Sequence, residues 1–354
     1  MSTSSLRCPY CLQQAAQFLQ DEKTRVPHCP NCQTGIPKAF LDSQLLLRPM
    51  VGVVGFSGHG KTVYLTSLFS SLKRFSNYWG GYYFRSLDDF THRLIYEQVP
   101  LFEKGALPES TPANFPNPAL VHYHQLPEFE DAFVGYYDTA GEVFNDVNRI
   151  ARAGYFVAHA DTVLFILSVP DCAKEDLDDT MSRLLDTYIR ATTDRLDTEI
   201  KERQRVVVIF TKADKQDARL NNDLKEWLSK GTAEHYAMGL SDHLLDLGLN
   251  SVKIEEWLRQ DLDCTRFANM ARDNFKDVRY TIVSATGLGG DEEHSNVMNP
   301  LRVLDPFLWV LEFARQDIQP IEKVGFFQKV LLWMRLKKSE AKKPQLPNPK
   351  PARP

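Results

Sequence analysis

Residues 55–62, with the sequence GFSGHGKT, have the types and the spacing best suited to chemistry. They fit the pattern G-x-x-x-x-G-K-[ST], in which glycines let the backbone turn its N–H groups toward the phosphates of a nucleotide. In such a loop the lysine, here Lys61, reaches the β- and γ-phosphates, and the hydroxyl of Thr62 reaches Mg²⁺. We therefore predict that a triphosphate contacts Gly55, Gly58, His59, Gly60, Lys61, Thr62 and Val63.

The segments on either side of this loop match what the loop requires. Residues 50–54, with the sequence MVGVV, are a continuous apolar run typical of a buried strand. After the loop, apolar residues recur at helical spacing, at Leu65, Leu68, Phe69 and Leu72. Strand, glycine loop and helix in this order favour phosphate binding over a simple glycine turn with a solvated lysine.

Apolar runs of strand length alternate with helical patterns between residues 49 and 318. Further runs lie at 162–167, 206–210 and 280–283, and at 119–124 and 132–137, where we expect two paired strands. The alternation predicts an α/β fold with a mostly parallel central sheet covered on both faces. Together with the glycine loop at 55–62, it predicts a P-loop NTPase three-layer sandwich.

Two stretches of this unit do not fit simple alternation. The proline-containing stretch 76–118 is expected to be rich in loops, and residues 216–277 are expected to form a helical insertion. The insertion is expected because the distance between the two flanking strands exceeds what one crossover helix needs.

The first 45 residues contain two C-x-x-C pairs, separated by 17 residues. That spacing is typical of a zinc ribbon, in which Zn²⁺ takes four tetrahedral thiolate ligands. A metal also replaces the hydrophobic core that so short a segment cannot build. We predict a zinc ribbon at 1–45 whose ligands are Cys8, Cys11, Cys29 and Cys32; the alternative is a redox-active dithiol.

Residues 319–354 are expected to form a separate terminal region. Aromatic and aliphatic residues alternate with lysines and arginines at about 323–343, and a proline-rich tail that we expect to be disordered follows. A basic amphipathic segment can make peripheral contact with an anionic membrane, here the inner membrane surface, or dock on protein. The simpler expectation is that this segment docks on the main domain or on a partner protein.

The net charge and the lengths of the apolar runs exclude some classes of protein. The net charge of −4 argues against a broadly basic surface for nucleic acid, which we do not expect among the partners. No run of apolar residues is long enough for a transmembrane helix, and the first residues lack a signal-peptide core. We therefore expect a cytoplasmic protein.

Three further motifs follow predicted strands. The first is DTAG at 138–141, where Asp138 can hold Mg²⁺ through water and the Gly141 N–H can touch the γ-phosphate. The second is TKAD at 211–214, with Thr211, Lys212 and Asp214. The third is SAT at 284–286, with Ser284, Ala285 and Thr286. A carboxylate can accept two hydrogen bonds from guanine that adenine cannot donate, so Asp214 is the predicted discriminating group.

The motifs GFSGHGKT, DTAG, TKAD and SAT, in this order, resemble those of the Ras-like, translation-factor-related (TRAFAC) P-loop GTPase superfamily. The resemblance covers about residues 50–317 and implies GTP and Mg²⁺ binding with hydrolysis to GDP, with Lys61, Gly141 and Glu142 at the reaction. The switch-one threonine of that family has no unique match: Thr111 is the first choice and Thr91 the alternative. Glu142 occupies the place of a water-orienting glutamine, which implies slow hydrolysis.

A cysteine ribbon before the phosphate loop, with the phrase GKTVYLTSL, also looks like the bacterial double-GTPase families. That resemblance implies a nucleotide-dependent switch in a multi-protein conflict, defence or signalling system. The expected partners are other proteins, such as a second GTPase or an activating protein. The alternative is a scaffold that binds GTP without hydrolysing it and recruits partners through its ribbon and its C-terminal helix.

Overall fold

The structure is a computed structural model, and it describes residues 6–15, 18–20, 25–42, 47–215, 218–230, 240–287 and 298–318. The chain divides into two compact units, Met1–Arg315 and Gln316–Pro354. The predicted terminal region at 319–354, with its basic segment at 323–343, lies outside the described residues. Within the described part, none of the helices combines the length and apolar character needed to cross a bilayer.

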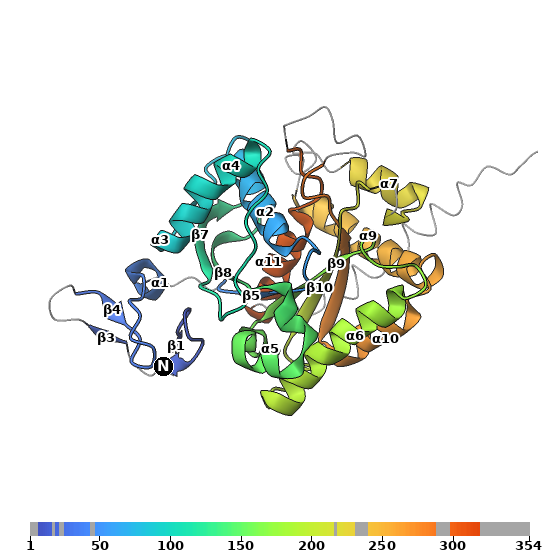
Figure 1. Cartoon of the computed structure of the whole chain (residues 1–354). Coiled ribbons are helices and arrows are strands. Elements are labelled where there is room, and N and C mark those ends of the chain that lie inside the picture. The colour runs from blue at the N-terminus through green and yellow to red at the C-terminus, as the bar shows by residue number, and fades with distance from the viewer. Residues whose placement is uncertain are drawn as a thin grey trace, which may run out of the picture. The chain divides into compact units, whose positions relative to one another are not determined.

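A seven-stranded sheet forms the centre of the first unit, in the order β11-β10-β9-β5-β8-β7-β6 (Figure 1). Its strands are β5 (Met50–Val54), β6 (Tyr83–Ser86), β7 (Ala119–Leu126), β8 (Glu130–Asp138), β9 (Thr162–Ser168), β10 (Arg205–Thr211) and β11 (Asp277–Ile282). The strands from β11 to β8 are parallel, whereas β7 and β6 join antiparallel at one edge. The predicted α/β fold with a mostly parallel sheet is confirmed.

The inner parallel strands β5, β9 and β10 consist mainly of apolar residues because helices cover both faces of the sheet. All residues of β5, β9 and β10 are buried. On one face lie α2 (Lys61–Phe75) and α11 (Asp305–Ile318); Phe69 and Phe307 contact the rings of Tyr136 and Tyr123. On the other face α6 (Leu177–Arg190) packs Tyr188 against Phe165, and α5 (Val147–Ala153) and α10 (Thr265–Asn274) lie beside it (Figure 1).

The stretch 76–118 contains more regular structure than its prolines predict. It forms the edge strand β6, the short helices α3 (Asp89–Arg93) and α4 (Val99–Glu103), and a wide helical turn, η1 (Leu94–Gln98), between them. The Asp88 side chain caps α3 by accepting a hydrogen bond from the Thr91 N–H. Pro100 lies in the first turn of α4, where a missing N–H costs nothing, so this proline does not break the helix.

Between β10 and β11, the region of the expected insertion, most of the described residues are helical. They form α7 (Asn222–Ser229), α9 (Leu240–Gln260) and α10. Trp257 of α9 is buried against Phe210 at the end of β10, and its indole N–H donates to the Arg219 carbonyl. These helices therefore extend the cover of the sheet beyond α6.

The N-terminal segment consists of two small hairpins and a short helix. The strands β1 (Leu6–Arg7) and β2 (Gln14–Ala15) pair, as do β3 (Leu19–Gln20) and β4 (Pro27–His28), and α1 (Lys38–Asp42) follows. This segment packs on the sheet face that carries α6. The Tyr137 hydroxyl donates to the Pro9 carbonyl at 2.5 Å, and Phe40 meets the Phe133 ring edge-on.

Candidate functional site

The glycine loop between β5 and α2 has the backbone that its sequence predicts. Gly60 has a φ of 85°, in the left-handed region that favours glycine, and directly precedes α2. Lys61 is buried, and its Nζ donates to the Phe56 carbonyl at 3.1 Å within the loop. Burial lowers the pKa of Lys61, and the nearby Asp138 carboxylate acts in the opposite direction. The loop thus holds an ammonium group against its own backbone carbonyl and near the Asp138 carboxylate.

Three side chains that sequence reasoning assigned to Mg²⁺ converge beside Lys61. The Thr62 hydroxyl donates to Asp138 Oδ2 at 2.8 Å and lies 2.7 Å from the Thr111 hydroxyl. Thr111 Oγ1 is in turn 3.1 Å from Asp138 Oδ2. The chain positions of these residues are far apart, so the site is assembled by the tertiary fold.

The structure separates the two candidate threonines. Thr91 is buried in α3, where its hydroxyl accepts a hydrogen bond from the Leu120 N–H at 2.8 Å, so it connects α3 to β7. Only Thr111 of the two lies at the site.

The donor set fits a hard divalent cation. Asp138 Oδ1 is buried and finds no hydrogen-bond partner within the described ranges, and burial raises the pKa of this carboxyl group although Lys61, Thr62 and Thr111 all favour its charged form. Two hydroxyls and a carboxylate are oxygen ligands of the kind Mg²⁺ prefers, directly or through water. Thr62, Thr111 and Asp138 are therefore the residues that would hold it.

A cavity of about 330 Å³ opens over this group. The glycine loop, the segment 108–111 and the segment 139–142 line it, and Glu142 is an exposed member of the last. Thr139 links the latter two, because its hydroxyl lies 2.8 Å from the Asn114 carbonyl and 3.2 Å from that of Pro112. The segment around Thr111 and the segment around Gly141 can therefore move together.

Gly141 allows a test of whether the segments around Thr111 and Gly141 move together with the bound phosphate. A Cβ at Gly141 would lie 2.1 Å from the Ser57 backbone nitrogen and 2.3 Å from the Phe56 carbonyl carbon, so the two backbones touch. We expect Gly141→Ala to force segment 139–145 away from the glycine loop and to lower the ratio of GTP to GDP affinity at least about 10-fold. Gly248→Ala, where the added Cβ meets nothing within 4 Å, is the matched control. Competition binding of a GTP analogue and GDP measures the ratio, and an unchanged ratio in Gly141→Ala would contradict the coupling.

The strand ends of β10 and β11 bring the TKAD and SAT segments together. Asp214 Oδ1 accepts a hydrogen bond from the Ser284 hydroxyl at 2.5 Å, and Ser284 Oγ accepts one from the Gly287 N–H. Among the residues that the structure describes, Asp214 Oδ2 is buried and has no hydrogen-bond partner. The Ser284 hydroxyl thus orients the Asp214 carboxylate through Oδ1, and Oδ2 can still accept hydrogen bonds.

Thr211 connects this segment to the glycine loop. Its hydroxyl donates to the His59 carbonyl at 2.8 Å, a contact that a short hydroxyl side chain can make from the end of β10. The His59 ring is buried, its Nδ1 lies 3.3 Å from the Ser168 N–H, and burial above all lowers the pKa of His59 to about 4. His59 is therefore a neutral acceptor that fixes the loop against β9.

The remaining predicted residues lie around the same end of the sheet. The Ser67 hydroxyl of α2 donates to the Ala285 carbonyl at 2.8 Å, and Thr286 accepts a backbone hydrogen bond from Asn299. Lys212 has a φ of 56°, and its Nζ lies 2.5 Å from Asp171 Oδ2. Sequence reasoning missed Asp171, although it follows the end of β9 as the other site residues follow their strands.

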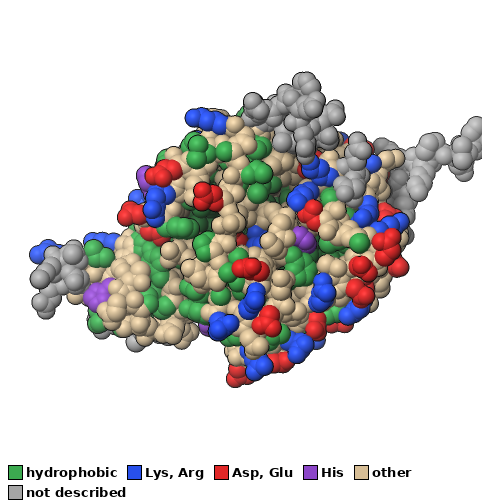
Figure 2. All heavy atoms as spheres, viewed as in Figure 1, with side chains coloured by type: hydrophobic (Ala, Val, Ile, Leu, Met, Phe, Trp, Pro, Cys, Tyr) green, Lys and Arg blue, Asp and Glu red, His purple; other side chains and the backbone are tan. Residues whose placement is uncertain are grey.

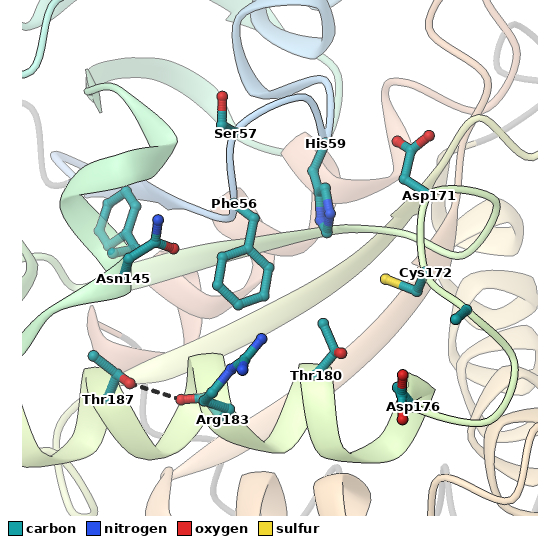
Figure 3. A pocket seen from close by; sticks show the side chains of 12 residues that line it. Phe56, Ser57, His59, Asn145, Asp171, Cys172, Asp176, Thr180, Arg183 and Thr187 are labelled. Atoms are coloured by element: carbon teal, nitrogen blue, oxygen red, sulfur yellow. Dashed lines mark hydrogen bonds between the residues drawn. The ribbon is translucent and has the colours of Figure 1, made fainter.

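A second cavity, of about 600 Å³, shares Ser57 with the first (Figure 3). The Phe56 and His59 rings project into it from the glycine loop, and Arg183 of α6 points toward Phe56 from the opposite wall (Figure 3). Cys172 and Asp171 close one end. Over α6 and α10 acidic and basic side chains are mixed rather than gathered into one basic patch (Figure 2).

The four N-terminal cysteines form one cluster, with their sulfur atoms within 4.8 Å of one another. Cys8 Sγ lies 3.9 Å from Cys32 Sγ, and Cys11 Sγ lies 3.7 Å from Cys29 Sγ. Sulfur atoms held about 2.3 Å from one tetrahedral ion would be roughly 3.8 Å apart, so the spacing fits zinc.

Each cysteine pair of the cluster has the same local turn. The Tyr10 N–H points at Cys8 Sγ and the Asn31 N–H at Cys29 Sγ, both at 3.4 Å. Such bonds stabilise thiolates, whereas burial raises the pKa of Cys11 to about 11. A bound cation would offset that cost, so the turns fit a metal better than they fit four free thiols.

Comparison with protein families adds an independent finding. A family model described as Double-GTPase 2 matches residues 49–244, which is more than half of the 354 residues. The match includes the glycine loop, Asp138 and Asp214, but ends before Ser284 and excludes the cysteine cluster. No curated protein matches the chain.

Proposed function

The chain belongs to the Double-GTPase 2 family, and from that premise we propose that it binds GTP, hydrolyses it slowly to GDP and acts as a nucleotide-dependent switch. The observation that carries guanine recognition is the state of Asp214. Ser284 binds one carboxylate oxygen, and the other is buried without a hydrogen-bond partner in the described part of the chain. Guanine would supply the missing donors from N1 and N2, whereas adenine would leave the carboxylate unsatisfied.

At the phosphate end, Lys61 and the loop N–H groups would bind the β- and γ-phosphates, and the Gly141 N–H would contact the γ-phosphate. Thr62, Thr111 and Asp138 would hold Mg²⁺, which neutralises charge on the phosphate oxygens when it is bound. Loss of the γ-phosphate would release the segments around Thr111 and Gly141, which Thr139 links. This arrangement supports a switch, and we propose that the chain is related to the Ras-like (TRAFAC) superfamily.

Slow hydrolysis follows from Glu142. An exposed carboxylate at the rim of the phosphate cavity adds negative charge near the γ-phosphate, where a neutral amide would orient water without repulsion. We expect a single-turnover rate constant on the order of 10⁻³ s⁻¹ or less for the native chain, and a several-fold increase in Glu142→Gln. Phosphate release, followed with and without K⁺, measures the rate constants of the native chain and of Glu142→Gln. Phosphate release by Lys61→Ala gives the background rate.

The same experiment separates the second candidate function, which Glu142 also favours. A scaffold that binds GTP without turning it over would release no phosphate above the Lys61→Ala background in either the native chain or Glu142→Gln. Fast hydrolysis by the native chain would contradict both the slow switch and the scaffold.

We further propose that Cys8, Cys11, Cys29 and Cys32 bind Zn²⁺ and that the resulting ribbon recruits a partner. The segment contacts the α/β domain close to the switch, because Tyr137, which precedes Asp138, binds the Pro9 carbonyl. The partner class is a second GTPase or an activating protein in a bacterial conflict, defence or signalling system, with the chain in the cytoplasm. Co-purification with the tagged chain in its GTP and GDP states would identify it.

A further inference from the structure

A second group of metal-ligand side chains lies on the sheet, separate from the cysteines. It consists of His122 and His124 of β7 and Asp131 of β8, whose ligand atoms lie within 4.8 Å of one another. The two histidines are two residues apart and therefore face the same side of the sheet. A register shift between Tyr123 and Leu126 in the β7–β8 pair brings Asp131 opposite them.

The distances in this group fit a small cation. Asp131 Oδ2 lies 2.9 Å from His124 Nδ1 and 3.4 Å from His122 Nε2. Ligand atoms held about 2.0–2.2 Å from one tetrahedral ion would lie roughly 3.3–3.6 Å apart, so only small movements separate the observed arrangement from a bound one.

His122 also has an unexplained buried nitrogen. The residue is 6% exposed, and its Nε2 has no hydrogen-bond partner among the described residues, although it faces Asp131. A buried polar atom without a full hydrogen bond destabilises the fold, so this nitrogen is available to bind a ligand.

Neighbouring side chains hold the group in place. Phe133 stacks on His122 with ring centroids 4.2 Å apart, and Tyr83 stacks on His124 at 4.3 Å. Asp131 Oδ1 accepts a hydrogen bond from the Gln125 N–H at 2.9 Å, which leaves Oδ2 directed at the histidines.

One contact must change when a metal binds. Arg85 Nη2 lies 3.4 Å from His122 Nδ1, and that nitrogen must carry the proton if Nε2 binds a metal. Arg85 is an exposed side chain on the edge strand β6, so it is free to turn toward solvent.

We propose that His122 Nε2, His124 Nδ1 and Asp131 Oδ2 bind a divalent transition-metal cation, with Zn²⁺ as the physiological ion and water in a fourth position. Two imidazoles and one carboxylate suit Zn²⁺ rather than Mg²⁺. Asp131 lies near the start of β8 and Asp138 at its end, roughly 23 Å apart along the strand. The site is therefore distinct from the nucleotide site and from the cysteine cluster, and it would join β7 to β8 beside the sheet edge.

Cobalt titration of the full, metal-stripped chain tests this site. Co²⁺ bound by thiolates gives a sulfur-to-metal charge-transfer band, whereas Co²⁺ bound by nitrogen and oxygen gives only ligand-field bands. We expect the native chain to bind two ions, and His124→Ala to bind one while keeping the charge-transfer band. The variant with serine at all four positions Cys8, Cys11, Cys29 and Cys32 should lose that band and keep the second ion, and His92→Ala, at an exposed histidine, should keep both.

The result that would overturn the proposal is equal metal binding by the native chain and His124→Ala. The group would then be an ion pair of His124 with Asp131. Asp131→Asn, which keeps the shape of the side chain, provides the same comparison if His124→Ala does not fold, and circular dichroism of each variant reports on folding.

Discussion

Lys61→Ala is expected to abolish stable GTP binding. The ammonium group lies buried in the glycine loop beside Asp138, so truncation removes the charge that faces the phosphates and leaves a buried carboxylate without it. The ammonium and the phosphate that it would bind form a buried charge pair. Removing one partner of such a pair costs about 2–5 kcal/mol, which corresponds to a loss of GTP affinity of at least about 30-fold. Retention of labelled GTP on a filter and a fluorescence titration both measure the loss.

The matched control is Lys73→Ala, on the same helix. Lys73 is half-exposed and pairs with Glu103 at 3.4 Å, so its removal should change stability slightly and GTP affinity not at all. Unchanged retention in Lys61→Ala, with an unchanged thermal midpoint, would exclude the glycine loop as the phosphate site.

Asp214→Asn is expected to change the base that the site accepts. The amide would present a donor where guanine also presents donors, and xanthine, which has a carbonyl at that position, would become the better ligand. Hydrogen bonds to charged groups contribute about 1.5–3 kcal/mol each, so the loss of two predicts a decrease in GTP affinity of roughly 100-fold or more. Displacement of one labelled nucleotide by GTP and by XTP measures which base the native chain and the variant prefer.

Asp242→Asn, at an exposed position near the start of α9, is the control for the loss of a negative charge. It should leave both affinities unchanged. An Asp214→Asn variant that still prefers GTP to XTP would show that another group reads the base.

The sequence predicted the parts of the fold that depend on local pattern. The buried strands β5, β9 and β10 were recognisable because each contains a continuous run of apolar or small residues and helices cover both faces. The edge strand β6 and the short helix α4 were not, because their pattern spans too few residues and a proline in the first turn of α4 reads as a helix breaker.

The candidate site was predictable to the extent that its residues follow strands. Carboxyl ends of parallel strands meet at one edge of a sheet, so Asp138 and Asp214 were expected near the glycine loop. The choice between Thr111 and Thr91 was not predictable, because both precede β7 and only tertiary structure brings Thr111 to Thr62. The group of His122, His124 and Asp131 was also missed, since it depends on a register shift in the β7–β8 pair.

The most direct test of the central claim is equilibrium competition by GTP and ATP against a labelled guanine nucleotide, with nucleotide-free chain and Mg²⁺ present. If Asp214 reads guanine, GTP should displace the label at concentrations at least about 100-fold lower than ATP does. Removal of Mg²⁺ should weaken the GTP curve, because Thr62, Thr111 and Asp138 lose their shared cation. Equal displacement by ATP and GTP would contradict a guanine-specific switch built on this site.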